Sequence, residues 1–121
     1  PQGPFDGAVC LLTLHFLDHT ERLRTVREIH RRLRPGAPLV AAHSSFPQEG
    51  AARGRWLSRY ADFAVASGAD PQQAVGAREA VDAALNLFDP GMDEAILKDA
   101  GFADAELFYA AFTWRGWIGH A

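Results

Sequence analysis

A strand, a helix and a second strand follow one another in the first third of the chain, and this order constrains the fold most. Residues 8–14, Ala-Val-Cys-Leu-Leu-Thr-Leu, form a nearly continuous apolar run, typical of a strand buried on both faces of a parallel sheet. Residues 39–42, Leu-Val-Ala-Ala, form a second apolar strand. Two strands separated by one helix predict a parallel βαβ unit. The alternative is a pair of unrelated strands in an α+β domain.

The segment between these strands carries the signals of an amphipathic helix. Asp18 can cap its N-terminus, and Glu21 follows three residues later, as in a capping box. Helical spacing brings four apolar residues onto one face, with the arginines expected on the solvent side: Leu23, Val26, Ile29 and Leu33. Pro35 and Gly36 mark the end of the helix.

The rest of the chain is first helical and then strand-like. One helix is predicted to end at Gly68, and its apolar face consists of Trp56, Leu57, Tyr60, Phe63 and Ala64. A second helix starts at Asp70-Pro71 and is predicted to stop at residues 89–91, before a short helix over 93–100.

The chain ends in residues 106–112 and 113–118, which are apolar on both faces and predict two central strands. We therefore expect a strand-helix-strand unit over 1–46, with residues 1–4 as a turn or linker. A helical insert over 47–90 and a helix with a terminal antiparallel strand pair over 91–121 complete the chain.

Charge and composition narrow the classes of function. The net charge of −3 argues against a dedicated nucleic-acid arm and favours a small-molecule substrate, but it leaves room for a local basic patch. The single cysteine, Cys10, cannot form an internal disulfide, which indicates an intracellular, cytoplasmic location. No apolar run approaches the roughly 20 residues that span a bilayer, so no membrane segment is expected.

Four segments resemble, in order, the later half of class I S-adenosylmethionine-dependent methyltransferases. Residues 5–17 resemble strand four of that family, and residues 27–40 resemble the following helix and strand five. Residues 96–102 resemble the helix before strand six, and residues 108–119 resemble strands six and seven. Ala37-Pro38 departs from the glycine usual at that turn. The resemblance implies an α/β fold: the C-terminal half of a Rossmann-like methyltransferase sheet, strands four to seven with the last antiparallel, and a helical insert.

The cofactor loop of that family has no counterpart in this sequence. No Gly-rich segment follows a strand and opens a helix, and no acidic residue stands where the family binds the ribose hydroxyls. The resemblance therefore places the family's first three strands before Pro1, and the chain does not begin with methionine. We expect the chain alone to bind S-adenosylmethionine weakly or not at all.

The end of the first strand is the predicted cofactor site. Ligands of open α/β sheets bind beyond the carboxyl ends of the strands, at the topological switch point. The resemblance implies that Leu11 (through its backbone), Thr13 and His15 contact the methionine part of the cofactor. The alternative is that Thr13 and His15 finish a strand and satisfy local hydrogen bonds.

The helical insert supplies the predicted substrate residues. Residues 59–80 resemble the insert of the branch related to wobble-uridine tRNA carboxymethyl transferases. Arg78 matches an arginine that this branch directs towards an anionic group, because a guanidinium pairs well with a carboxylate. Tyr60 is predicted to belong to an aromatic substrate pocket. The alternatives are a solvated arginine and an aromatic core.

Other candidate chemistry is weak. The five histidines lack metal-ligand spacing, so no metal is expected. Residues 43–45, His-Ser-Ser, lack a nucleophile elbow and are expected to form a wall of the site. No catalytic acid or base is assigned.

Two hypotheses of function follow. The first is the C-terminal portion of a methyltransferase acting on a small molecule or RNA. The second is a non-enzymatic interaction module, a homo-oligomer that associates through the exposed edge of strand 8–14 or through the insert. Half of a nicotinamide-binding domain shares this topology but does not account for the antiparallel aromatic ending.

Overall fold

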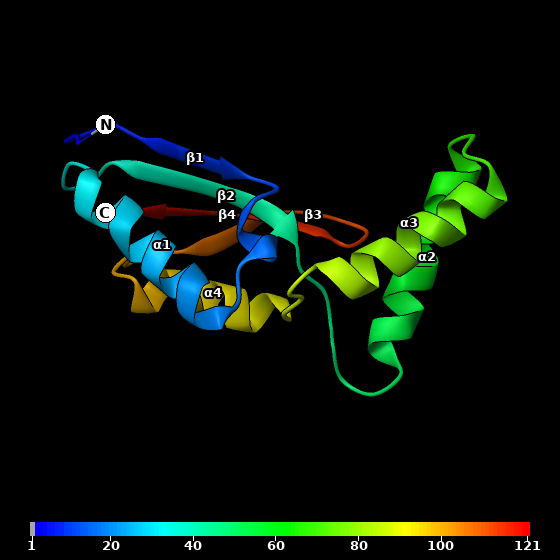
Figure 1. Cartoon of the computed structure of the whole chain (residues 1–121). Helices are drawn as coiled ribbons and strands as arrows, with labels where there is room; N and C mark the ends of the chain where they lie inside the picture. Colours follow the sequence, from blue (N-terminus) through cyan, green and yellow to red (C-terminus); the bar gives the residue numbers. More distant parts are fainter. Residues whose placement is uncertain (1) are drawn as a thin grey trace.

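The computed structural model describes residues 2–121 as a mixed sheet, helices on one of its faces and a projecting helical pair (Figure 1). Pro1, expected to belong to a turn, lies outside the described residues. The elements in chain order are β1 (Ala8–Leu11), the 3₁₀ helix η1 (Leu14–Phe16), α1 (His19–Arg32), β2 (Pro38–Ser44), α2 (Ala52–Ala66), α3 (Pro71–Ala84), α4 (Pro90–Asp99), β3 (Glu106–Ala111) and β4 (Trp114–His120).

The strand order in the sheet is β1-β2-β4-β3. β1 and β2 are parallel, with Val9 opposite Val40, which confirms the predicted βαβ unit. β4 runs antiparallel to both of its neighbours, so the predicted antiparallel ending is also confirmed. β4 is central, but β3 lies at the edge of the sheet, and the prediction of two central terminal strands is wrong for β3.

One face of the sheet is packed against α1 and α4. The core there includes Val26 from α1, Ile96 from α4 and Trp117 from β4, all nearly without solvent exposure. Phe102, in the turn after α4, is also fully buried and packs against His30 at the end of α1. The apolar spacing of α1 therefore contributes the core face that the sequence predicts, and the core residues of α4 are seen only in the structure.

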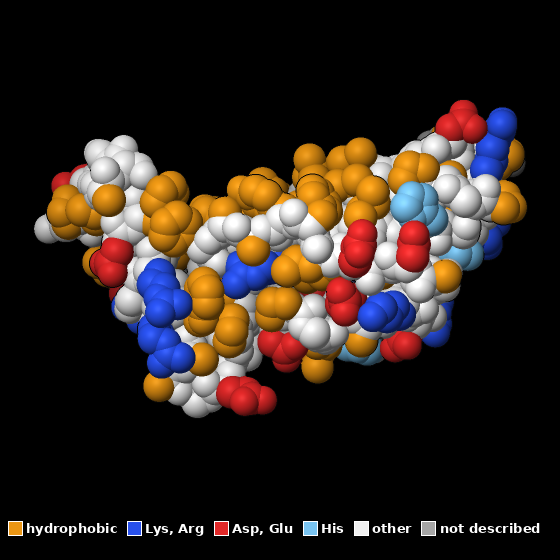
Figure 2. Space-filling view, turned by 180° about the vertical axis from the view of Figure 1, so that it is seen from behind, with side chains coloured by type: hydrophobic (Ala, Val, Ile, Leu, Met, Phe, Trp, Pro, Cys, Tyr) orange, Lys and Arg blue, Asp and Glu red, His pale blue; other side chains and the backbone are white. Residues whose placement is uncertain are grey.

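The opposite face of the sheet is open. Val9 is 69% exposed and Leu11 is 53% exposed, because no element within residues 2–121 covers this side of β1. Figure 2 shows hydrophobic side chains gathered on the back of the molecule. The prediction that the first strand is buried on both faces is therefore wrong for this chain.

The first strand is also shorter than its apolar run. Leu12 adopts a φ of 54°, in the left-handed region that bulky side chains disfavour, and its N–H donates to the carbonyl of Ala42 at 2.7 Å. The backbone turns at this point, and residues 14–16 form η1. β2, in contrast, extends beyond the predicted residues 39–42 to include His43 and Ser44.

Aspartate caps define three of the helices. Asp18 accepts a hydrogen bond from the N–H of Glu21 at 2.9 Å, as the sequence predicts for α1. Asp70 caps α3 in the same way. Asp89, which was predicted to stop a helix, instead caps α4, with Pro90 at its first position, while α3 ends at Ala84. An Asp-Pro pair is a start signal at both sites, because proline suits the first helical turn.

The helical insert, α2 and α3, lies beyond the carboxyl ends of β1 and β2 (Figure 1). A second, smaller hydrophobic cluster of Phe46, Leu57 and Leu87 joins α2 to the segments that enter and leave the insert. Aromatic contacts also tie α2 to the β3–β4 hairpin, where the rings of Phe63 and Phe112 stack with centroids 4.2 Å apart. No helix within residues 2–121 is long and apolar enough to cross a membrane.

Candidate functional site

The carboxyl ends of β1 and β2 meet at one edge of the sheet, and the predicted cofactor residues lie there. Leu11 is the last residue of β1 and is exposed. Thr13 is also exposed, and its hydroxyl donates to the carbonyl of Leu11 at 2.9 Å. This local hydrogen bond is the one expected if Thr13 only finishes the strand, so the cofactor role of both residues stays a prediction.

His15 is buried at the same edge, within η1. Its Nδ1 accepts a hydrogen bond from the N–H of Ser44 at 3.0 Å, which joins the end of β2 to the loop after β1. Burial, followed by the nearby charges of His43 and Arg22, lowers the pKa of His15 to about 4. The imidazole is therefore neutral near pH 7.

A buried ion pair lies among these elements. Arg22 of α1 has 0% exposure, and its Nη1 donates to Oδ1 of Asp93 at 2.7 Å. The Nη2 of Arg22 donates to the carbonyls of Leu17 at 3.0 Å and Asn86 at 2.6 Å. The guanidinium also lies over the ring of Phe88, 4.2 Å from its centroid. A single side chain thus connects α1, the loop after β1, the linker after α3 and α4.

His43, near the end of β2, also contacts this pair. Its Nε2 lies 3.2 Å from Oδ1 of Asp93, but the ring is not oriented for a hydrogen bond, and Oδ2 of Asp93 has no partner within residues 2–121. Burial alone would raise the pKa of Asp93, but the interactions with His43, Ser45 and Arg22 outweigh it and lower that pKa. Asp93 is therefore held as a carboxylate beneath the carboxyl ends of β1 and β2.

The sequence analysis did not predict this network. It placed the arginines of α1 on the solvent side, but Arg22 is fully buried, because it shares the helix face of Val26, Ile29 and Leu33. The sequence contained a signal for this burial, because Val26, Ile29 and Leu33 follow Arg22 by four, seven and eleven residues. Positions with these spacings lie on one side of a helix. His43 and Ser44 were expected after the strand, but they belong to β2 and are buried.

The predicted substrate residues lie on the insert. The ring of Tyr60 on α2 makes an edge contact with Trp114, with centroids 5.6 Å apart. Trp114 is the cross-strand partner of Ser44 in β2, and the N–H of Ser44 donates to His15. Tyr60 is therefore connected to His15 through two intermediate residues, Trp114 and Ser44. Arg78 is half-buried on α3. Tyr60 is thus connected to the end of the sheet where β1 and β2 terminate, and among residues 2–121 no contact brings Arg78 there.

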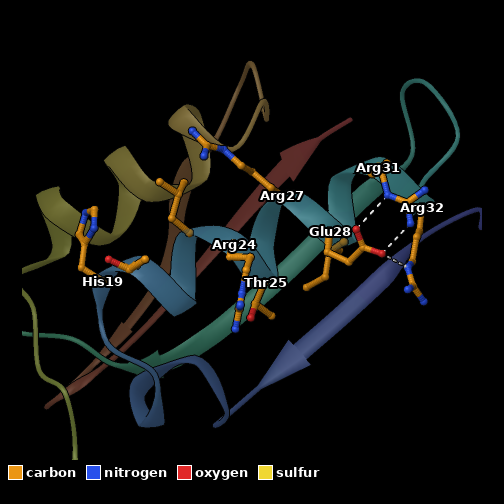
Figure 3. A pocket seen from close by; sticks show the side chains of 10 residues that line it. His19, Arg24, Thr25, Arg27, Glu28, Arg31 and Arg32 are labelled. Atoms are coloured by element: carbon orange, nitrogen blue, oxygen red, sulfur yellow. Dashed lines mark hydrogen bonds and ion pairs between the residues drawn. The ribbon is translucent and has the colours of Figure 1, made fainter.

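A separate groove of about 930 Å³ follows α1 (Figure 3). It is lined by side chains of α1, and neither Thr13 nor His15 contributes to it. Within residues 2–121, no three His, Cys, Asp or Glu side chains come together to hold a metal ion.

The comparisons with known proteins agree with this fold. No protein-family model matches the chain. The carboxy-S-adenosyl-L-methionine synthase of Geobacter sp. (strain M21) is 26% identical over 106 residues, which are 88% of this chain and 43% of that protein. The synthase of Desulfotalea psychrophila is 26% identical over 113 residues, 93% of this chain and 46% of that protein. The chain therefore spans less than half the length of these curated relatives.

Solved structures show the same relation. PigF with SAH superposes with a TM-score of 0.67 at 14% identity, over 100% of this chain and 32% of PigF. Human N-acetylserotonin methyltransferase in complex with SAM gives a TM-score of 0.62 at 15% identity, over 99% of this chain and 30% of that enzyme. The chain therefore has part of the class I S-adenosylmethionine-dependent methyltransferase fold, as the sequence resemblance implies. It aligns with about a third of each of these two chains.

Asp93→Asn is expected to destabilise the fold by about 3–5 kcal/mol, because it leaves the buried Arg22 without a counter-charge. The free energy of unfolding in urea measures this loss. The matched control is Glu94→Gln on the same helix. Glu94 forms a surface ion pair with Lys98, with Oε2 and Nζ 3.2 Å apart, and the loss of this ion pair is expected to cost less than about 1 kcal/mol. Equal losses in the two variants would contradict the role assigned to the buried pair.

The neutral state of His15 predicts a pH dependence of stability. The unfolded chain binds a proton at His15 near pH 6.5, whereas the folded chain does so only near pH 4, so stability falls as the pH falls between these values. His15→Asn retains a side-chain acceptor but cannot be protonated, and it is expected to flatten the unfolding free energy over that range. His19→Asn, at an exposed histidine, is the control. An unchanged slope in His15→Asn would show that His15 titrates normally.

Proposed function

We propose that this chain forms the later half of the catalytic domain of an S-adenosylmethionine-dependent transferase. The observation that carries the proposal is the alignment of nearly the whole chain, including the antiparallel β4. The chain aligns with about a third of the length of two chains, one solved with SAH and one with SAM. In this role the carboxyl ends of β1 and β2 hold part of the cofactor.

The residues at this edge suit the methionine part of the cofactor. Leu11 and Thr13 are both exposed where β1 ends, and in this proposal the backbone of Leu11 and the hydroxyl of Thr13 contact the cofactor. His15 is neutral, so it does not repel the positively charged sulfonium of S-adenosylmethionine. When bound, the cofactor supplies an electrophilic methyl or related one-carbon group. The chain's own residues position that group and exclude water, which is much of the catalysis such a transfer needs.

A small molecule is the proposed acceptor. The insert lies beyond the carboxyl edge (Figure 1), and Tyr60 connects to that edge through Trp114 and Ser44. Arg78 on α3 has the charge to bind an anionic group of the cofactor or acceptor. A cytoplasmic location belongs to the same proposal and is supported by the unpaired Cys10.

Calorimetry with S-adenosylhomocysteine tests the enzymatic proposal. The complete gene product is expected to bind it, and Thr13→Val is expected to weaken binding about tenfold, equivalent to about 1.4 kcal/mol. Thr25→Val on α1, outside the carboxyl edge, is the matched control.

The 121-residue chain alone is expected to bind weakly or not at all. Absence of binding by the complete gene product would refute the enzymatic proposal. Micromolar binding by the 121-residue chain alone would refute the expectation that this chain binds weakly or not at all.

A second candidate function is self-association, as an interaction module. The edge position of β1 favours it, because one side of this strand is not paired within residues 2–121 and Val9, in the strand itself, is 69% exposed. An exposed, apolar edge strand is a template for pairing with another strand. The occupant proposed for this edge is β1 of a second copy of the chain.

Light scattering at high protein concentration tests self-association. The unmodified chain is expected to form dimers, and Val9→Lys is expected to shift them to monomers, because a charge on an edge strand opposes pairing. Val75→Lys is the matched control, since Val75 is 53% exposed on α3, away from the sheet. A strict monomer, or equal dissociation in both variants, would contradict the proposal.

A further inference from the structure

The charges of this chain are segregated, although the net charge is only −3. Residues 19–34 contain six arginines and two glutamates, whereas the rest of the chain contains six basic and 13 acidic residues. Because Arg22 is buried against Asp93, the surface charge of this segment comes from the other five arginines, of which Arg34 is paired with Asp6 at 3.2 Å: Arg24, Arg27, Arg31, Arg32 and Arg34. A polyanion would therefore be attracted to α1 and repelled elsewhere.

The basic residues of α1 line the open groove along this helix. Arg24, Arg27 and Arg31 follow one another on its outer side, and Arg24 and Arg31 lie about 10 Å apart along the axis. In Figure 3 the side chains of Arg24 and Arg27 leave α1 in different directions, and Arg31 is joined to Glu28. Arg24 and Arg27 are exposed and make no hydrogen bond or ion pair within residues 2–121. The guanidinium groups of Arg24 and Arg27 are therefore free to donate hydrogen bonds to a ligand.

Glu28 orders the side chains of Arg31 and Arg32 at the C-terminal end of α1. Its carboxylate accepts two hydrogen bonds from Arg31, at 2.6 and 2.9 Å, and one from Arg32 at 2.7 Å. These hydrogen bonds lower the pKa of Glu28 to about 2, so the carboxylate stays ionised at any physiological pH. One negative charge thus orders two guanidinium groups and leaves the groove positively charged.

We propose that the outer face of α1 docks the phosphodiester backbone of a nucleic-acid strand. Guanidinium groups bind phosphates through paired hydrogen bonds, and the regular spacing of arginines along a straight helix suits a ligand with repeated negative charges. The described residues that line this groove include no Phe, Tyr or Trp, and His19 at its N-terminal end is the one ring there, so we expect the backbone contacts to dominate over stacking on bases.

An acidic protein fits this groove less well. Protein interfaces need a desolvated core enriched in aromatic or other apolar side chains. The apolar residues of the groove, Leu23 and Ile29, are half-buried against the core of the domain. A phosphate backbone needs no apolar anchor, and the charge of the groove is complementary to it.

Fluorescence anisotropy with a short labelled oligouridylate tests the proposal on the full chain. Three phosphate contacts predict a slope of about −2 for the logarithm of the binding constant against the logarithm of salt concentration. The double variant Arg24→Gln/Arg27→Gln is expected to weaken binding at least tenfold and to reduce the slope to about −0.7.

The matched control is Arg55→Glu, which changes the net charge by the same amount at an exposed position on α2. Circular dichroism and melting temperature check that each variant is folded.

The outcomes separate the possible partners. Loss of binding in the double variant but not in Arg55→Glu supports the proposal, and equal binding of an oligodeoxyuridylate shows that the shared backbone is recognised. No binding at low salt, or equal losses in both variants, would overturn it. Polyglutamate that binds as tightly as the oligonucleotide would also overturn it and point to an acidic protein. None of these results bears on S-adenosylhomocysteine binding, which is tested separately.

Discussion

The buried ion pair of Arg22 and Asp93 is the interaction on which the arrangement of the carboxyl edge depends. A buried charge needs hydrogen-bond and ion-pair partners, since an unpaired buried ion costs several kcal/mol. The two Nη atoms of Arg22 find them in Asp93 and in the carbonyls of Leu17 and Asn86, while Arg22 Nε and Asp93 Oδ2 have no partner within residues 2–121. The loop after β1, the linker after the insert and α4 are therefore held in one relative position, and any site at this edge inherits that geometry.

The molecule presents three surfaces with different chemistry. The end of the sheet where β1 and β2 terminate combines the exposed residues Leu11 and Thr13 with a buried, neutral His15 and faces the insert. The open sheet face is apolar and ends at the unpaired edge of β1. The outer side of α1 is basic, and its separation from the acidic remainder of the chain is hidden by the small net charge. Each surface has a different class of proposed partner: a cofactor, a second copy and a polyanion.

Local signals account for the elements that the sequence predicted well. The cap at Asp18 and the apolar spacing from Leu23 to Leu33 specify α1, because both act within a few turns of helix. The predictions fail where distant residues decide. Residues 8–14 suggested a long buried strand, but the chain turns at Leu12 and one face of β1 is open. Asp89-Pro90 is a different case, a local start signal that was interpreted as a stop, although the same pair opens α3 at Asp70-Pro71.

The sequence by itself determined the order of strands and helices, the caps at Asp18 and Asp70, and the position of His15 at the end of the first strand. These features depend on periodicity and near-neighbour hydrogen bonds, which a linear pattern contains. Only the tertiary structure decided that β4 lies between β2 and β3, that Arg22 meets Asp93 across 71 positions, and that Ser44 donates to His15. Such contacts depend on which side chains share a buried space, and burial is a property of the packed chain.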